Sequence, residues 1–261
     1  MNPLLTLAIH AATEAGREIK KLYATTDFER KDDGSPITIA DTRANDIIIG
    51  HLAKTGIKIL SEESTGVDLP YPSQIWIIDP LDGTRDFIEK TDDFVVMIGL
   101  LQEGRPILGV VYAPIHETLY YAELGMGAWK MQGDVVEKLT VSSRTEDLRF
   151  VRSIHHATHE MQEVAKKLGA TFLPRGSMGI KAGMVCEGEG DFFYTRGKVG
   201  EWDVCAPEII TLEAGGTVTD CNGNSLFYGT EDHRIQDGIL FSNTVCHEHV
   251  LNALKPIANR S

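Results

Sequence analysis

Five short apolar runs, each bounded by turn residues, lie between residues 57 and 123 and constrain the fold more than any other feature. The longest, at 94–101, has no polar side chain to face water, so we expect a strand that is buried on both faces. Such strands belong to a sheet with helices packed over it. The expected strands are IKIL (57–60), IWII (75–78), FVVMIGLL (94–101), ILGVVYA (107–113) and TLYYAE (118–123).

Helices are expected on either side of this block of strands. Apolar residues recur at helical spacing over 3–23, and a second helix is expected to begin near Asp41. After about Ser142 strands and helices alternate, which indicates a layered α/β/α/β/α arrangement, a mixed α/β (α+β) class, with sub-domains at 1–142 and 143–261. In this second half we expect strands at 149–154, 191–196, 216–220 and 238–243, and helices at 159–169, 180–188, 203–216 and 246–257.

The charge balance excludes one class of function. The 261 residues include 38 acidic and 25 basic side chains, a net charge of −13, so a basic groove for nucleic acid is not expected. The four cysteines have irregular spacings, which favours reduced thiols. The first residues lack the pattern of a signal peptide, and the apolar runs fall short of the roughly 20 residues of a membrane span. We therefore expect a cytoplasmic protein.

The segment IWIIDPLDGTRDFIEK (75–90) carries the strongest chemical signal. We expect a buried strand that ends at Asp79, a turn made by Pro80 and Gly83, and a helix from Thr84. This places the carboxylates of Asp79 and Asp82 beside the N–H groups of a helix N-terminus, where phosphate binds. Carboxylates next to a phosphate repel it unless a cation lies between them, and hard oxygen ligands favour Mg²⁺ or Mn²⁺.

Other interpretations of this segment stay open from the residues alone. The two aspartates can simply cap the turn and the helix. A calcium loop of the EF-hand type fits poorly, because positions 81 and 83 are Leu and Gly. The nucleophile loop of haloacid-dehalogenase-type phosphatases also fits poorly, because its two aspartates are two residues apart and these are three apart.

Three further acidic positions lie at junctions between a strand or loop and a helix. Glu62 and Glu63 follow an expected strand, and only one of them can face the same site as Asp79. Asp41 and Asp203 each stand near an expected helix start, where capping is the simpler role for either taken alone. Together, however, the acidic positions occupy the places at which α/β folds collect ligand groups.

With these motifs the chain resembles the inositol monophosphatase superfamily of Mg²⁺-dependent, lithium-sensitive phosphatases. The segments that carry the resemblance span most of the chain, and several look most like those of 3'(2'),5'-bisphosphate nucleotidases, which convert 3'-phosphoadenosine 5'-phosphate to AMP and phosphate. The carrying segments are SPITIAD (35–41), SEES (61–64), DPLDGTRDF (79–87), RPILGVVYAP (105–114), GSMGIK (176–181) and EWDVCAPEIITLEAGG (201–216).

The resemblance implies two to three Mg²⁺ ions and assigns their ligands. Glu62, Asp79 and the backbone carbonyl of Leu81 would hold one ion. Asp79, Asp82 and Asp203 would hold a second, with Asp203 also beside the substrate. The ions would bring about four to six positive charges and reverse the local sign, so the acidic composition does not exclude a small phosphorylated substrate.

The resemblance also implies the catalytic and substrate contacts. Asp41 and Thr84 would position and deprotonate the attacking water, and the N–H groups of Gly83 and Thr84 would meet the scissile phosphate. Three further positions would contact the nucleotide: His156, Ser177 and Lys181. From its apolar helix alone, Lys181 is expected to be a surface lysine that snorkels to solvent.

Two alternatives to a nucleotidase are kept. Inositol or sugar phosphatases such as fructose 1,6-bisphosphatases use the same metal site, and Gly200 and Glu201 depart from the pattern in a way that bears on nucleotide preference. The second alternative is a nucleotide-binding module without turnover. Such a module would not need Asp41 and Thr84 to activate a water. The resemblance also allows a homodimer.

Overall fold

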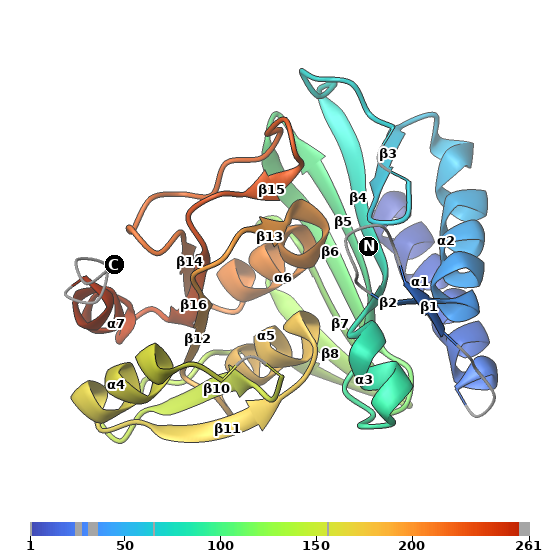
Figure 1. The fold of residues 1–261 in the computed structure, drawn as a ribbon. Coiled ribbons are helices and arrows are strands. Elements are labelled where there is room, and N and C mark those ends of the chain that lie inside the picture. Colours follow the sequence, from blue (N-terminus) through green and yellow to red (C-terminus); the bar gives the residue numbers. More distant parts are fainter. Residues whose placement is uncertain (1, 24–27, 31–35, 65, 156, 256–261) are drawn as a thin grey trace.

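The computed structural model describes residues 2–23, 28–30, 36–64, 66–155 and 157–255. Two β-sheets alternate with pairs of helices, and the layers follow one another across the molecule as helix, sheet, helix, sheet, helix (Figure 1). Of the described residues, no helix combines the length and apolar composition that crossing a membrane requires. The expected layered α/β/α/β/α class is confirmed.

The first sheet contains the five strands expected from the apolar runs. Its strands follow one another in chain order from β3 to β9, with β3 and β4 parallel and the later pairs antiparallel. Both faces of its strand β5 are buried, as the unbroken run at 94–101 predicts. The strands are β3 (Lys58–Ser61), β4 (Gln74–Asp82), β5 (Val95–Gln102), β6 (Arg105–Ala113), β7 (Thr118–Glu123), β8 (Ala128–Gln132) and β9 (Val135–Lys138).

Helices α1 (Pro3–Leu22) and α2 (Ile39–Leu52) cover the outer face of the first sheet (Figure 1). Helix α1 begins where the Asn2 side chain accepts the Leu4 N–H at 2.9 Å, and Pro3 fits the first helical position. A buried stripe of alanines on α1 lets it pack tightly. Helix α2 begins two residues earlier than expected, because Thr38 rather than Asp41 is its N-cap.

Helices α5 (Met178–Cys186) and α6 (Glu201–Glu213) lie between the two sheets. Helix α6 packs closely on β5 and β6 because Gly99 and Gly109, paired across these strands, have no side chains to hold it away. A Cβ atom on Gly109 would lie 2.6 Å from the carbonyl oxygen of Ala206, and one on Gly99 would clash with Cys205. The distance from α6 to the first sheet is therefore set by these glycines.

The second sheet has the strand order β11-β10-β12-β16-β14. Its outer face packs against α4 (His159–Leu168) and α7 (His247–Leu254) through an apolar cluster that includes Phe150, Phe192 and Leu240. The strands are β10 (Arg149–Ser153), β11 (Thr171–Arg175), β12 (Phe192–Thr195), β14 (Gly216–Thr219) and β16 (Ile239–Asn243).

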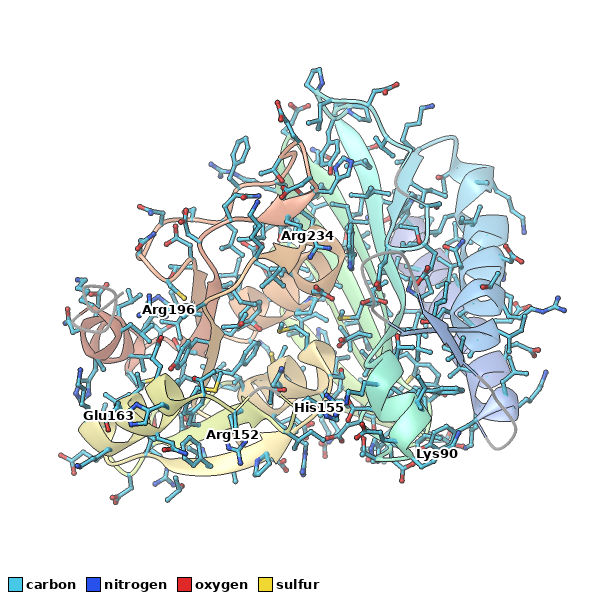
Figure 2. The ribbon with its side chains drawn as sticks, viewed as in Figure 1. Lys90, Arg152, His155, Glu163, Arg196 and Arg234 are labelled. Carbon is cyan, nitrogen blue, oxygen red and sulfur yellow. The ribbon has the colours of Figure 1, made fainter. Side chains whose placement is uncertain are left out.

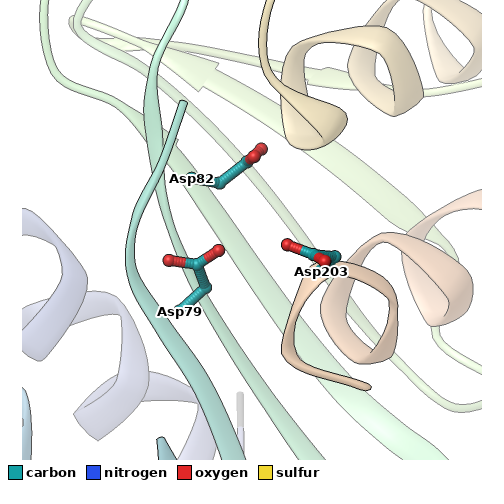
Figure 3. Close-up of side chains that lie close together, drawn as sticks. All are labelled: Asp79, Asp82 and Asp203. Carbon is teal, nitrogen blue, oxygen red and sulfur yellow. The ribbon is translucent and has the colours of Figure 1, made fainter. Parts of the chain in front are cut away.

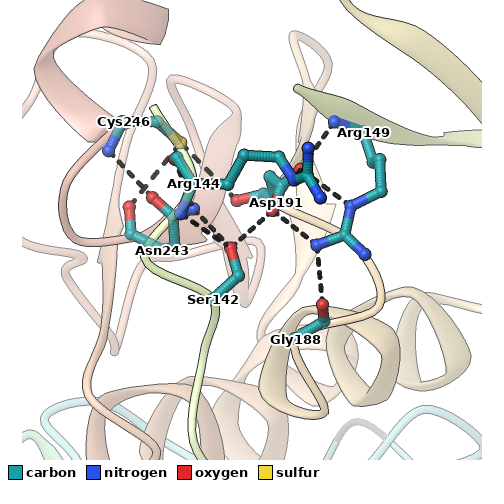
Figure 4. A network of polar contacts seen from close by, with 7 residues as sticks. All are labelled: Ser142, Arg144, Arg149, Gly188, Asp191, Asn243 and Cys246. Carbon is teal, nitrogen blue, oxygen red and sulfur yellow. Dashed lines mark hydrogen bonds and ion pairs between the residues drawn. The ribbon is translucent and has the colours of Figure 1, made fainter. Parts of the chain in front are cut away.

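A buried aspartate joins the segment after the first sheet to the second sheet. Asp191 is fully buried and accepts the Ser142 hydroxyl at 2.5 Å and the Arg149 guanidinium at 2.9 Å (Figure 4). Asn243 on β16 donates to the same Ser142 oxygen at 2.8 Å. The network fixes the chain near residue 142, while the division into sub-domains at that point stays a prediction.

Several short strands were not predicted from the sequence, and two helices begin at other residues than predicted. Strands β9 and β11 were not expected, because β9 is exposed at a sheet edge and β11 contains Pro174. Helix α6 begins at Glu201 rather than at Asp203, and α5 covers 178–186 rather than 180–188. The remaining described elements are the turn η1 (Ala53–Thr55), α3 (Thr84–Glu89) and the strand pairs β1 (Phe28–Arg30) with β2 (Pro36–Thr38) and β13 (Val199–Gly200) with β15 (Arg234–Ile235).

Candidate active site

A bulge at the end of β4 brings Asp79 and Asp82 to the same site. Side chains three apart on a regular strand point to opposite faces. Here Asp79 pairs with Met97 and Asp82 with Val95, so three steps along β4 match two along β5. The extra residue turns both carboxylates the same way. The strand thus continues past Asp79, where the sequence predicted its end.

The backbone after the bulge is held by local contacts. The Leu81 N–H donates to the Asp79 carboxylate at 2.9 Å, and the Leu81 side chain is buried. Gly83 follows in the left-handed region, with φ of +92°, and precedes the short helix α3. A Cβ atom there would lie 2.7 Å from the carbonyl oxygen of Asp93, so this position requires glycine on two counts.

Asp203 completes the cluster from the first turn of α6. Asp79, Asp82 and Asp203 each place a carboxylate oxygen so that these atoms lie within 4.8 Å of one another (Figure 3). The Gly200 N–H donates to Asp203 at 3.0 Å, so Asp203 also caps its helix, as its position alone suggested. Oxygen ligands in this number suit a hard divalent cation.

The electrostatics of the cluster fit a cation. Burial raises the pKa of Asp79 well above its usual range, and the charges of Glu62, Asp82 and Asp203 raise it further. Burial likewise raises the pKa of Asp203, with Asp82 and Glu62 adding to it. A divalent cation held between these carboxylates would relieve that repulsion, so the residues present fit a metal site.

Glu62 lies at the rim of the same site. It follows β3 and lines the pocket, and it acts electrostatically on Asp41, Asp79 and Asp203. Its carboxylate is not one of the oxygens within 4.8 Å of one another. Of the neighbouring glutamates, Glu62 lines the pocket and Glu63 does not.

Asp41 and Thr84 form a hydrogen-bonded pair beside the cluster. The Thr84 hydroxyl lies 3.0 Å from Asp41 Oδ1 and 3.2 Å from the Leu81 carbonyl oxygen. The other Asp41 oxygen accepts the N–H and the hydroxyl of Thr38, both at 2.7 Å. Burial raises the pKa of Asp41, and these bonds partly offset it. Asp41 is therefore a rigid acceptor that binds back to Thr38, the N-cap of α2, and faces Thr84.

The N-terminus of α5 holds Asp82. The Ser177 hydroxyl donates to Asp82 Oδ2 at 2.6 Å, and the Gly179 N–H donates to the same oxygen at 2.8 Å. Ser177 also lines the pocket. Lys181 is 8 % exposed and lines the pocket too, so its expected position on the surface is wrong. Burial lowers the pKa of Lys181, and Asp82 and Asp203 counteract this.

The pocket has a volume of about 330 Å³ and two walls. One wall is formed by the carboxylates, Lys181 and the start of α3. The opposite wall comes from the second sheet and α4, and it contains Val151, Ser153, Met161, Tyr194 and Thr195. The composition of this second wall could not be read from the sequence, because it depends on how the second sheet faces α3.

His155 is a pocket residue that the sequence did not single out for this site. Its Nε2 lies 2.9 Å from Asp86 Oδ1, across the gap between the second sheet and α3 (Figure 2). Its side chain is 10 % exposed. The neighbouring His156, which the resemblance placed at the nucleotide, lies outside the described residues.

Comparison with known proteins identifies the family. The model of the inositol monophosphatase family matches residues 1–257. A protein named 3'(2'),5'-bisphosphate nucleotidase CysQ from Haemophilus influenzae is 33% identical over 239 residues, 88% of each chain. The Escherichia coli K12 protein of the same name is 32% identical over 246 residues, 92% of this chain and 99% of that protein.

Solved structures agree with this assignment. CysQ from Bacteroides thetaiotaomicron, described as a bacterial member of the inositol monophosphatase family, has a TM-score of 0.81 at 32% identity, with 92% of this chain and 97% of that chain covered. The extragenic suppressor protein SuhB from Bartonella henselae has a TM-score of 0.84 at 27% identity, with 97% and 99% covered. The chain belongs to the inositol monophosphatase family. It is a phosphoric monoester hydrolase of the kind found among its CysQ relatives.

Proposed function

We propose that the protein is a Mg²⁺-dependent phosphatase that removes the 3'-phosphate of 3'-phosphoadenosine 5'-phosphate to give AMP and phosphate. The observation that carries the proposal is the convergence of Asp79, Asp82 and Asp203 beside the hydrogen-bonded pair of Asp41 and Thr84. A cluster that only bound a nucleotide would have no need of a hydroxyl aligned with a buried carboxylate. The relatives named as 3'(2'),5'-bisphosphate nucleotidases support the choice of substrate.

For two or three ions, the carboxylates would be shared as the resemblance implies. Asp79, Asp82 and Asp203 would hold one Mg²⁺, and Glu62, Asp79 and the Leu81 carbonyl would hold another, with a third bound weakly near Thr84. When bound, Mg²⁺ stabilises the charge that develops on the phosphate and makes water at the site more acidic. Asp82 is kept in place for this role by Ser177 and Gly179.

The protein's own residues can move the proton of the attacking water. Thr84 Oγ1 accepts a proton from water while its own proton passes to Asp41 Oδ1, which lies 3.0 Å away. The oxygen of the water forms a bond to phosphorus, and the bond from phosphorus to the 3'-oxygen breaks. The leaving oxygen then takes a proton from solvent. The N–H groups of Gly83 and Thr84 at the start of α3 orient the phosphate.

The second wall of the pocket favours a nucleotide as the leaving group. Val151, Met161 and Tyr194 line this wall and are almost wholly buried, so they present small apolar edges against which a purine can lie. An inositol or fructose ring carries hydroxyl groups on every side and would leave this surface unmatched. Lys181 and, on the expectation drawn from the sequence, His156 would meet the remaining polar groups of the nucleotide.

A substrate panel tests this assignment. With Mg²⁺, we expect kcat/KM for 3'-phosphoadenosine 5'-phosphate to exceed that for inositol 1-phosphate and fructose 1,6-bisphosphate by about 10-fold or more, because only the nucleotide fills the second wall. The measurement is phosphate release at several concentrations of each compound. A preference for either ring alcohol would replace the nucleotidase by the inositol or sugar phosphatase, and no release from any of them would contradict a phosphatase acting on this class.

Replacing Thr84 tests the proton path. Thr84→Ala should lower kcat about 100-fold, because general-base assistance contributes at least that much. KM should change little, since the backbone N–H at position 84 remains. Thr84→Ser keeps the hydroxyl and serves as the matched control, with kcat expected near that of the natural protein. If kcat falls equally in both variants, the Thr84 hydroxyl does not take part in the proton transfer.

Three further expectations remain proposals about the whole protein. They are two sub-domains at 1–142 and 143–261, a homodimer, and a cytoplasmic location without nucleic acid as a partner. Size-exclusion chromatography with light scattering measures the second of these directly.

A further inference from the structure

A buried glutamate at the start of α6 connects three segments of the chain. Glu201 is fully buried and does not line the pocket. Its Oε1 accepts the N–H of Gly229 at 2.8 Å and that of Thr230 at 3.2 Å. Its Oε2 accepts the hydroxyl of Tyr71 at 2.7 Å. The departure at position 201 therefore bears on the framework of the site and not on contacts to the substrate.

His233 joins Glu201 and Tyr71 in a hydrogen-bonded group of three residues. Its Nδ1 lies 2.7 Å from the Tyr71 hydroxyl, and the two rings stack with centroids 5.8 Å apart and an angle of 13° between their planes. The His233 carbonyl also accepts the Glu201 N–H at 3.0 Å. His233 is buried and holds a left-handed φ of +52°, which is uncommon for a residue other than glycine.

The protons in this group can be assigned. A carboxylate only accepts, and the single hydrogen of the Tyr71 hydroxyl is donated to Glu201 Oε2. The Tyr71 oxygen can then act only as an acceptor toward His233. His233 must therefore carry a proton on Nδ1.

The position of these contacts relates them to the metal ligands. Tyr71 lies between β3 and β4, on the same connection as Glu62, whereas Glu201 lies two residues before Asp203. The bonds from Tyr71, Gly229 and Thr230 to Glu201 thus hold the first turn of α6, which carries Asp203. Glu62 is held separately, because its N–H donates to the Ile78 carbonyl on β4 at 3.2 Å.

We infer that Tyr71, Glu201 and His233 form a positioning contact that fixes the first turn of α6, and with it Asp203, relative to Asp79 and Asp82 before a cation binds. The inference rests on the proposed metal site. None of the three residues touches the substrate pocket, so they act through the carboxylates that they position.

The test is Mn²⁺ binding in the absence of substrate, followed by electron paramagnetic resonance. Tyr71→Phe keeps the ring and removes the hydroxyl, and it should weaken Mn²⁺ binding about 10-fold, as loss of a supporting contact does at other metal sites. The matched control is Tyr228→Phe. Tyr228 donates to Glu208, which lies further along the same helix α6 than Glu201, so this change leaves the bonds to Glu201 in place. The control should lower the melting temperature and leave Mn²⁺ affinity within about twofold of the natural protein.

The outcomes separate the possible failures. If the natural protein binds no Mn²⁺, the proposed metal site and this inference both fall. If it binds Mn²⁺ and Tyr71→Phe binds equally well, or both variants weaken binding equally, only the positioning contact is overturned. A second measurement needs no variant: ¹⁵N NMR of the natural protein should show His233 protonated on Nδ1, and a neutral ring with its proton on Nε2 would contradict the contact.

Discussion

Asp82→Asn should lower kcat for phosphate release at least about 100-fold, while the metal-free protein becomes more stable. This decrease in kcat is larger than the one expected when a residue that only supports a ligand is changed, because Asp82 itself is the proposed Mg²⁺ ligand. Asparagine keeps an oxygen that can accept from Ser177 and Gly179, so the local structure should persist. Activity should be measured with Mg²⁺ in excess, and stability in the presence of a chelator.

The gain in stability follows from the direction of the pKa shift. Burial raises the pKa of Asp82 despite its bonds to Ser177 and Gly179, so its ionised form disfavours the folded state. That disadvantage is absent at low pH and grows as the pH rises through the pKa of the folded state. At pH 8 the melting temperature of the variant should rise by about 2 to 4 °C for each 1 kcal/mol gained in the free energy of unfolding. Added Mg²⁺ should raise the melting temperature of the variant less than that of the natural protein.

Asp46→Asn is the matched control, because it makes the same chemical change on the exposed side of α2. Its activity and its response to Mg²⁺ should equal those of the natural protein. Near-native activity of Asp82→Asn with Mg²⁺ would remove Asp82 from the site.

Glu208→Gln should make the stability of the protein less dependent on pH. Glu208 lies on α6, is 8 % exposed and accepts the hydroxyl of the buried Tyr228. Burial raises the pKa of Glu208 to about 7, and the bond from Tyr228 opposes this rise. Its stabilising contribution is therefore complete below the unfolded value near 4.5 and is lost as the pH rises through about 7.

The size of this effect can be bounded. The difference between the two pKa values corresponds to about 3 kcal/mol at pH values above both. Thermal unfolding of the natural protein and of Glu208→Gln, compared from pH 5 to 8.5 with a chelator present, should diverge in favour of the variant as the pH increases. The acidic cluster is common to both proteins, so its own pH dependence cancels in the difference.

Glu163→Gln on the exposed face of α4 provides the comparison for this experiment (Figure 2). Its unfolding curve should follow that of the natural protein at every pH. If Glu208→Gln also follows it, Glu208 does not titrate near neutral pH in the folded protein.

The parts of the site that could be predicted are those whose residues are neighbours in sequence. Asp79, Asp82, Gly83 and Thr84 lie within one strand, turn and helix, and the residue types indicated a metal and phosphate site by themselves. The bulge in this segment could not be predicted from its own residues, because a bulge is defined by the pairing of β4 with β5. Without the bulge, the two aspartates would have been expected on opposite faces of the strand.

The remaining parts depend on contacts between distant segments. Asp41 and Asp203 are ordinary helix caps when considered alone, and only the resemblance placed them in the site. Lys181 was expected on the surface from its own helix, because nothing in that helix shows that the second sheet covers it. His155 and Asp86 are 69 residues apart, and their contact follows from the placement of β10 against α3.

The paired glycines beneath α6 have a consequence for protein design. Any side chain at Gly99 or Gly109 would push α6 outward and move Asp203, so the wall that holds the carboxylates tolerates little change. The facing wall is built on other elements and contributes none of the three clustered carboxylates. A library randomised at Ser153 and Thr195, which line this wall outside the buried apolar clusters, should therefore yield enzymes that accept different phosphate esters while the hydrolytic machinery stays the same.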